Sequence, residues 1–292
     1  MGSIRKLAFL RILFCFLLIV CLLVGCGDSK APEQSSQTTS SQNSSSQPSV
    51  STSSSDQPQS SSSESSSAVS SSTGSSSSTA TLPVDNAYFD DAVFVGDSVT
   101  LKLQYYVMNK RQSEPDYLGQ AQFLASGSLG WANALWEISS ESVHPSYKGT
   151  KMLIEDAIQQ MGAKKVYIML GVNDIGLYGV DDTLENAKTL LGRILEKNPD
   201  AQLFVQSVTP MVKGKELRDL NNTTIKEFDD KLQAYCQQAG CTFVDVASVM
   251  RDSEGYLPLE YCSDPSGENS LGIHFTDTAC EKWIEYLQTP VS

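Results

Sequence analysis

The chain has 292 residues, of which 34 are acidic and 21 are basic, so its formal net charge is −13. A surface with this excess of negative charge repels polyanions, which excludes nucleic acid and anionic wall polymers as bulk binding partners. The charge instead favours a neutral or weakly charged substrate.

Residues 1–25 are typical of a bacterial secretory signal. Three basic side chains precede an apolar run over residues 12–24, and this run is too short for an ordinary membrane-spanning helix. Gly25 and Cys26 follow it in a pattern that resembles the lipobox of a lipoprotein. We therefore expect a lipid anchor on Cys26 at the outer face of the cytoplasmic membrane. The alternative is a plain secretory signal in which the cysteine is incidental.

A serine-rich segment follows over residues 26–81. Between residues 31 and 80, 26 of 50 residues are serine. Such a stretch has too little apolar surface to offset the entropy lost on ordering. We expect a flexible tether that spans roughly 40 Å on average, although a spacer that carries sugars is not distinguished by composition.

The remaining residues, 82–292, suit a single domain with a sizeable core. They contain Cys236, Cys241, Cys262 and Cys280, without the spacing of a zinc site, so the sequence predicts no metal and no cofactor. Outside the cell a local disulfide between Cys236 and Cys241 is possible, and free buried thiols are the alternative. No Gly-rich phosphate loop follows a strand, which argues against nucleotide chemistry.

Strands and helices alternate along this domain. The strands are short apolar runs, and the helices carry apolar side chains at helical spacing. This alternation predicts an α/β fold, in which a five-stranded parallel sheet lies between two layers of helices. We expect strands over residues 92–96, 121–125, 165–170, 201–208 and 241–246, and helices over residues 99–110, 149–161, 182–197, 223–240 and 277–287.

Ser98 stands where the first of these strands meets a helix, in Gly96-Asp97-Ser98. A serine on a tight turn at the carboxyl end of a buried strand keeps its hydroxyl exposed, as a nucleophile requires. Gly-Asp-Ser is also ordinary turn chemistry, so the tripeptide alone decides little. Asp97 is expected to cap the helix rather than to react.

Further polar groups follow other strands. Asn173 and Asp174 come after the strand over residues 165–170, and Gly127 comes after the second strand. His274 is one of only two histidines in the chain, and the other, His144, is expected to be structural, with substrate contact as the alternative. Loops at the carboxyl edge of an open α/β sheet form its usual ligand site.

Together these blocks resemble the SGNH (GDSL-type) hydrolases over roughly residues 92–283. The pattern of that family is a serine in Gly-Asp-Ser, a glycine after the second strand, an asparagine in Gly-x-Asn-Asp and a late Asp-x-x-His. The resemblance implies a flavodoxin-like architecture with Ser98 as nucleophile and His274 as base. It further implies that the oxyanion hole consists of the backbone N–H groups of Ser98 and Gly127 and the side-chain amide of Asn173.

One position departs from the pattern, because Leu271 stands three residues before His274 where aspartate is expected. Three outcomes are open. A backbone carbonyl could orient the histidine in a Ser-His dyad, Asp264 or Glu268 could supply the carboxylate from the preceding loop, or the site could be inactive. The dyad is the first expectation.

The resemblance and the anchor together predict a lipid-anchored extracellular esterase that removes small acyl groups, acetyl above all. Its expected partners are an ester-bearing small molecule or glycan and, through the anchor, the membrane. Trp131, Tyr178 and Tyr261 could stack on a sugar ring or could be packing residues. The alternatives are an O-acyltransferase with the same acyl-enzyme and an inactive scaffold that binds glycans.

Overall fold

The computed structural model describes residues 84–267 and 270–289. The predicted signal over residues 1–25, the lipid site at Cys26 and the tether over residues 26–81 lie outside the described residues and stay predictions. Among the described residues, no helix combines the length and apolar character needed to cross a bilayer.

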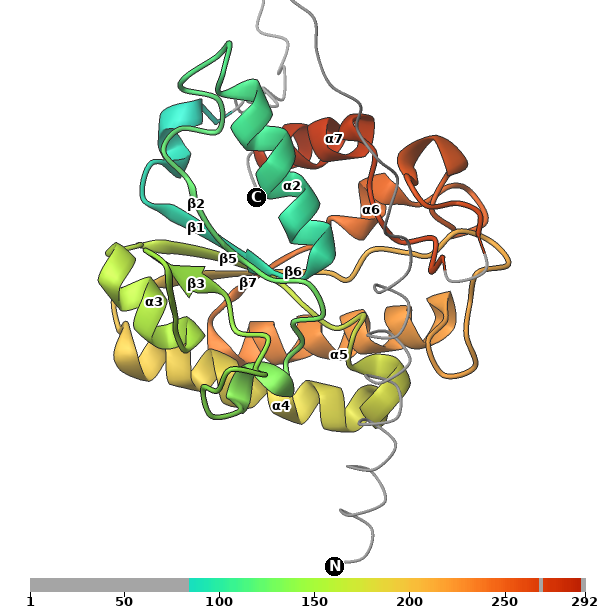
Figure 1. Ribbon diagram of the computed structural model, residues 1–292. Helices are drawn as coiled ribbons and strands as arrows, with labels where there is room; N and C mark the ends of the chain where they lie inside the picture. Colours follow the sequence, from blue (N-terminus) through green and yellow to red (C-terminus); the bar gives the residue numbers. More distant parts are fainter. Residues whose placement is uncertain (1–83, 268–269, 290–292) are drawn as a thin grey trace, which may run out of the picture. The chain divides into compact units, whose positions relative to one another are not determined.

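Five parallel strands form the central sheet (Figure 1), which confirms the predicted α/β fold. The strand order is β2-β1-β5-β6-β7, so β1 and β5 are central neighbours. Every residue of β1 is buried, as a strand covered by helices on both faces requires. The strands are β1 (Ala92–Gly96), β2 (Gln122–Ala125), β5 (Lys165–Met169), β6 (Gln202–Gln206) and β7 (Thr242–Val244).

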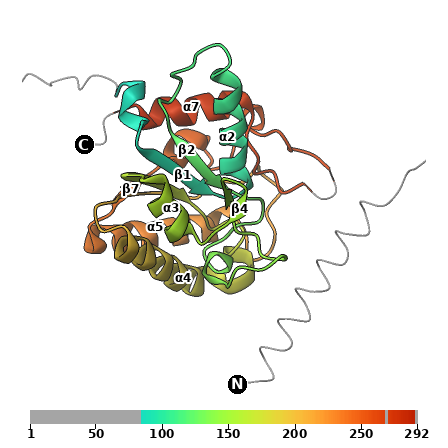
Figure 2. The ribbon, with the colours of Figure 1, turned by 60° about the vertical axis from the view of Figure 1, so that its left-hand side comes forward.

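Helices cover both faces of this sheet (Figure 2). Side chains of α3, α4 and α5 pack in one apolar cluster with Val93 and Val95, while those of α2, α6 and α7 pack in a second cluster with Phe94. Successive side chains of β1 point to opposite faces of the sheet, so they contribute to two separate apolar cores. The helices are α2 (Ser98–Lys110), α3 (Ile154–Met161), α4 (Ile175–Lys197), α5 (Asn222–Ala239), α6 (Ala247–Met250) and α7 (Asp277–Leu287).

Two helices differ from their predicted bounds by more than one residue. The helix predicted over residues 149–161 begins only at Ile154, because β3 (Ser146–Tyr147) and β4 (Thr150–Lys151) form a hairpin just before it. The helix predicted over residues 182–197 is extended by an earlier segment, and Gly179 joins the two with a φ of 78°. Glycine adopts this backbone conformation without strain, so the chain bends there and resumes its helix.

The described cysteines, Cys236, Cys241, Cys262 and Cys280, are all free thiols. The structure therefore shows the second of the two predicted alternatives. The sulfur of Cys241 lies 3.9 Å from the carbonyl oxygen of Cys236, across the turn that ends α5.

Candidate active site

Ser98 is the first residue of α2, directly after β1. Gly96 ends the strand, and a side chain at that position would collide with Thr100. Asp97 caps the helix, because its Oδ1 accepts a hydrogen bond from the Val99 N–H at 2.9 Å. The turn is therefore fixed on both sides and holds Ser98 at the carboxyl edge of the sheet.

His274 and Asp264 approach Ser98 as a hydrogen-bonded pair. Nε2 of His274 lies 3.0 Å from Oγ of Ser98, and Nδ1 of the same ring lies 2.9 Å from Oδ2 of Asp264. The His274 side chain is 36% exposed and that of Asp264 is 24% exposed, so solvent reaches the ring more readily than the carboxylate. An imidazole that donates its Nδ1–H to a carboxylate keeps the Nε2 lone pair free to accept a proton from serine.

A short antiparallel pairing brings Asp264 to His274. Cys262 and Phe275 form a β-bridge, and the Ser263 N–H donates to the His274 carbonyl oxygen at 2.8 Å. The backbone N–H of His274 in turn donates to Oδ1 of Asp264 at 3.0 Å. The carboxylate is thus held by the main chain of the same residue whose ring it contacts.

This arrangement corrects the first expectation for the third member of the site. No backbone carbonyl orients the ring within the described residues, because Nδ1 of His274 contacts Asp264 instead. Leu271, at the position where the family has aspartate, packs against the apolar core. The other carboxylate considered, Glu268, lies outside the described residues.

Asn173 follows β5 and faces the turn that carries Ser98. Its Nδ2 donates to the Leu129 carbonyl oxygen at 3.0 Å and lies 3.5 Å from Oδ2 of Asp97. The side-chain amide is partly exposed. The bond to Leu129 fixes the direction of the amide, and a substrate oxyanion would have to replace Oδ2 of Asp97 as the acceptor of the weaker bond.

Gly127 lies on the loop after β2, which is tied to the end of β1. The Ser126 N–H donates to the Gly96 carbonyl oxygen at 3.1 Å. Gly127 itself is exposed, and its N–H makes no hydrogen bond with the described part of the chain. The N–H of Ser98, at the start of α2, has no acceptor within the helix either. Both donors are free for a substrate oxygen.

Asp174 joins the loops after β2 and β5. Its two carboxylate oxygens accept hydrogen bonds from the N–H groups of Trp131 and Ala132, each at 2.9 Å. The indole N–H of Trp131 donates to the Leu170 carbonyl oxygen at 2.8 Å. Trp131 is fully buried, so it packs within this network and cannot stack on a sugar.

Burial shifts the pKa values of the carboxyl groups that lie beneath the site. It raises the pKa of Asp97 to about 7 and the pKa of Asp174 to about 6. Burial also acts on Asp264, but the hydrogen bonds from His274 and Cys262 outweigh it and hold the pKa of Asp264 below its ordinary value. Asp264 is therefore ionised at neutral pH and can stabilise an imidazolium.

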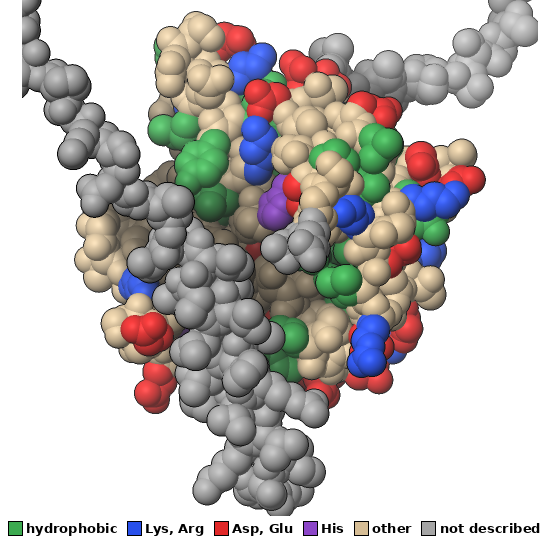
Figure 3. Space-filling model, turned by 45° about the vertical axis from the view of Figure 1, so that its right-hand side comes forward, with side chains coloured by type: hydrophobic (Ala, Val, Ile, Leu, Met, Phe, Trp, Pro, Cys, Tyr) green, Lys and Arg blue, Asp and Glu red, His purple; other side chains and the backbone are tan. Residues whose placement is uncertain are grey.

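One histidine is visible at the edge of a hollow on the face drawn in Figure 3. His144 is only 2% exposed, and its Nε2 lies 3.2 Å from the Ala134 carbonyl oxygen. The exposed histidine is accordingly His274, and His144 holds a loop in place.

A small cavity borders the site. Its volume is about 10 Å³, and its lining includes Val99, Val172 and Ile273, which are chain neighbours of Ser98, Asn173 and His274 respectively. A space of this size holds about one water molecule. The lining is mostly apolar, and neither Ser98 nor His274 belongs to it.

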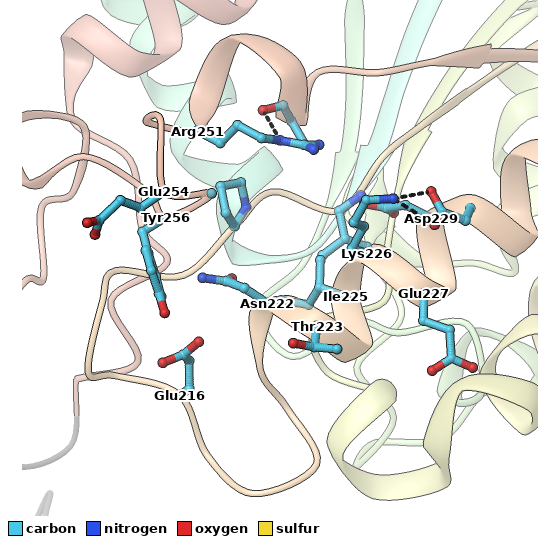
Figure 4. A pocket seen from close by; sticks show the side chains of 15 residues that line it. Glu216, Asn222, Thr223, Ile225, Lys226, Glu227, Asp229, Arg251, Glu254 and Tyr256 are labelled. Carbon is cyan, nitrogen blue, oxygen red and sulfur yellow. Dashed lines mark hydrogen bonds and ion pairs between the residues drawn. The ribbon is translucent and has the colours of Figure 1, made fainter.

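A larger cavity of about 550 Å³ lies between α5 and the loop over residues 251–256 (Figure 4). Charged side chains such as Arg251 and Asp229 line it. Neither the serine nor the histidine of the site is among its lining residues. It contains no nucleophile next to a base, so it is separate from the site that Ser98, His274 and Asp264 form.

The chain matches known proteins in two of three comparisons. A model of the GDSL-like Lipase/Acylhydrolase family matches residues 94–281. No curated protein matches. Among solved structures, a candidate platelet activating factor from Streptococcus pneumonia is 16% identical over 72% of this chain and 85% of its own, with a TM-score of 0.49. A GDSL-like lipase from Bacteroides thetaiotaomicron is 17% identical over 67% and 84% respectively, with a TM-score of 0.47.

Proposed function

This chain belongs to the GDSL-like lipase/acylhydrolase family, and from that membership we propose that it removes small acyl groups, acetyl above all, from a carbohydrate or cell-envelope glycan. The reaction class, ester hydrolysis by a serine hydrolase, follows from the family. The observation that carries the assignment of residues is the line of hydrogen bonds from Ser98 through His274 to Asp264.

In the proposed reaction Oγ of Ser98 attacks the ester carbonyl carbon while Nε2 of His274 takes its proton. Asp264 holds the Nδ1–H and stabilises the imidazolium that forms. The imidazolium then returns the proton to the leaving alcohol, which leaves an acyl group on Ser98. Water, activated by the same imidazole, releases the carboxylic acid and restores the serine.

The tetrahedral intermediates of both steps carry a negative oxygen. The N–H groups of Ser98 and Gly127 and the amide of Asn173 are the proposed donors to it. Because Asp97 and Asp174 lie nearby, a charged carboxylate at either position would oppose the oxyanion. Burial raises the pKa of both groups toward neutrality, which reduces that repulsion.

The preference for a small acyl group is supported by the expected location at the cell envelope, and not by the cavity between Val99 and Ile273, because Ser98 does not line that cavity. The preference for a glycan is supported by the expected tether and anchor, which would hold the domain near the cell envelope.

Asp264 also bears on the alternative of an inactive binding scaffold. That alternative arose from Leu271, which cannot orient a histidine. A carboxylate 2.9 Å from the ring supplies the missing contact, so the specific reason for an inactive site is removed.

The proposal is tested with the full-length chain and Ser98→Ala on p-nitrophenyl esters of increasing length and on acetylated glycans. We expect turnover of acetate esters that falls as the acyl chain lengthens and that is absent in Ser98→Ala. Adding a sugar alcohol as acceptor separates hydrolysis from acyl transfer. Equal turnover by the parent and Ser98→Ala would refute the serine mechanism, and a preference for long acyl chains would refute the substrate class.

The anchor is tested separately with Cys26→Ala. If Cys26 carries lipid, this variant leaves the membrane fraction or accumulates as the unprocessed precursor. Ser98→Ala, expressed in the same host, is the matched control and should stay in the membrane fraction. Unchanged membrane association of Cys26→Ala after detergent-free washing would refute lipid attachment.

A further inference from the structure

Cys262 contacts the carboxylate that orients His274. Its side chain is buried, with 4% of the residue exposed, and its sulfur lies 3.2 Å from Oδ1 of Asp264. The same oxygen accepts the backbone N–H of His274, and the other oxygen, Oδ2, faces the ring. The two oxygens of Asp264 therefore make different contacts: Oδ1 bonds to Cys262 and to the backbone, and Oδ2 bonds to the imidazole.

The protonation states of Cys262 and Asp264 decide which group donates the hydrogen bond between them. Burial raises the pKa of the Cys262 thiol to about 12, and the hydrogen bond to Asp264 acts in the same direction. The pKa of Asp264 stays below its ordinary value. The sulfur is thus a thiol and the acid is a carboxylate, so the S–H donates to Oδ1.

The backbone of Cys262 is held by the β-bridge that precedes the loop carrying Asp264. Cys262 takes part in the β-bridge with Phe275, and its N–H donates to the Leu259 carbonyl oxygen at 3.2 Å. Asp264 begins the loop that leads away from this bridge toward Gly267. The hydrogen bond from Cys262, in the paired segment, to Asp264, in the loop, therefore restricts the position of the carboxylate.

We infer that Cys262 is a positioning residue, whose thiol fixes the carboxylate of Asp264 so that Oδ2 meets Nδ1 of His274. The inference rests on the proposed function, because it concerns the geometry of the same site. It differs from simple packing in one respect. A packing role depends on the volume of the side chain, whereas a positioning role depends on the thiol S–H as a hydrogen-bond donor.

The test compares variants that separate volume from hydrogen bonding. Cys262→Ala removes both, Cys262→Val keeps apolar bulk without a donor, and Cys262→Ser restores a donor. Cys280→Ala is the matched control, because Cys280 is an equally buried thiol on α7 with no hydrogen bond from its sulfur within the described residues. Each is made in the full-length chain, and active sites are counted with a serine-directed phosphonate so that kcat refers to folded enzyme.

We expect Cys262→Ala and Cys262→Val to lower kcat on p-nitrophenyl acetate by about three- to tenfold with KM unchanged, which is the loss of one modest hydrogen bond. Cys262→Ser should recover most of that loss, and Cys280→Ala should keep parental kcat. The Nδ1–H proton resonance of His274 should weaken or shift in the alanine and valine variants and return in the serine variant.

Parental kcat in Cys262→Ala or, where that variant does not fold, in Cys262→Val would overturn the inference. The inference would also be overturned if the kcat of Cys262→Ser fell as far as that of Cys262→Val, because the loss would then come from the changed volume and not from the missing donor. Ser98→Ala and Asp264→Asn are measured alongside. If both lose turnover and Cys262→Val does not, only the positioning role fails, whereas parental turnover in Ser98→Ala refutes the proposed function itself.

Discussion

Oδ2 of Asp264 lies 2.9 Å from Nδ1 of His274, although ten positions separate the two residues in the chain. In the family pattern the carboxylate stands three residues before the histidine. Here Cys262, two residues before Asp264, pairs with Phe275, the residue after His274. This pairing brings a carboxylate that is distant in the chain to the histidine.

Asp264→Asn should lower kcat by about 10²–10⁴-fold with little change in KM. An amide cannot stabilise the imidazolium, and serine proteases lose up to about 10⁴-fold on the equivalent change. The measurement is kcat and KM on p-nitrophenyl acetate. Asp219→Asn, at an exposed carboxylate with no side-chain hydrogen bond in the described structure, is the control. If Asp264→Asn turns over as fast as the parent, Asp264 has no part in the reaction.

The strands and the position of Ser98 could be predicted because both are local features. An apolar run of five residues that ends in Gly96 specifies a buried strand and a sharp turn without any knowledge of distant contacts. The C-terminal helix could be predicted for the same reason, and α7 begins at Asp277 and ends at Leu287 as expected.

The sequence named Asp264 as one of the open candidates for the partner of His274 but could not select it. The role of Asp264 depends on the pairing of Cys262 with Phe275, which is a single bridge between two loop segments. Neither segment has the periodicity of a strand, so no sequence pattern marks the pairing. For Trp131 the sequence left stacking and packing open, and its burial selects packing, with the indole N–H donating to the Leu170 carbonyl oxygen.

Leu271→Asp should give no gain in kcat, although it restores the family pattern in sequence. Nδ1 of His274 already has a carboxylate partner, and Leu271 packs against the apolar core. A carboxylate introduced there loses apolar contacts and is partly desolvated, so we expect a lower Tm. Activity and thermal unfolding of the full-length chain check both points, with Leu271→Ala as the control for lost packing. A clear rise in kcat would show that Asp264 serves the histidine poorly.

Asn173→Ala should lower kcat by about 10²–10³-fold, the effect of removing one oxyanion donor, with a smaller change in KM. The variant also loses the hydrogen bond to the Leu129 carbonyl oxygen, so its Tm is measured to separate misfolding from catalysis. Asn109→Ala, at an exposed position of α2, is the control. An increase in KM with unchanged kcat would assign Asn173 to substrate binding instead.

Asp97→Asn should stabilise the protein by an amount that grows with pH. Asp97 is 2% exposed, and burial raises its pKa from 3.8 to about 7. Between these values the folded state holds a proton that the unfolded state has released, so the stability of the parent falls as pH rises through this window. Asparagine does not titrate, and its oxygen can still accept the Val99 N–H that caps α2.

The difference in Tm between Asp97→Asn and the parent is therefore expected to widen from pH 4 to about pH 7 and to stay constant at higher pH. Asp174 titrates in both proteins, and its repulsion of Asp97 in the parent contributes to the same trend. Asp116→Asn, at an exposed carboxylate, should show no such trend. A Tm difference that is flat from pH 4 to pH 8 would show that Asp97 is ionised throughout, and the carboxylate next to Ser98 would then carry its charge during the reaction.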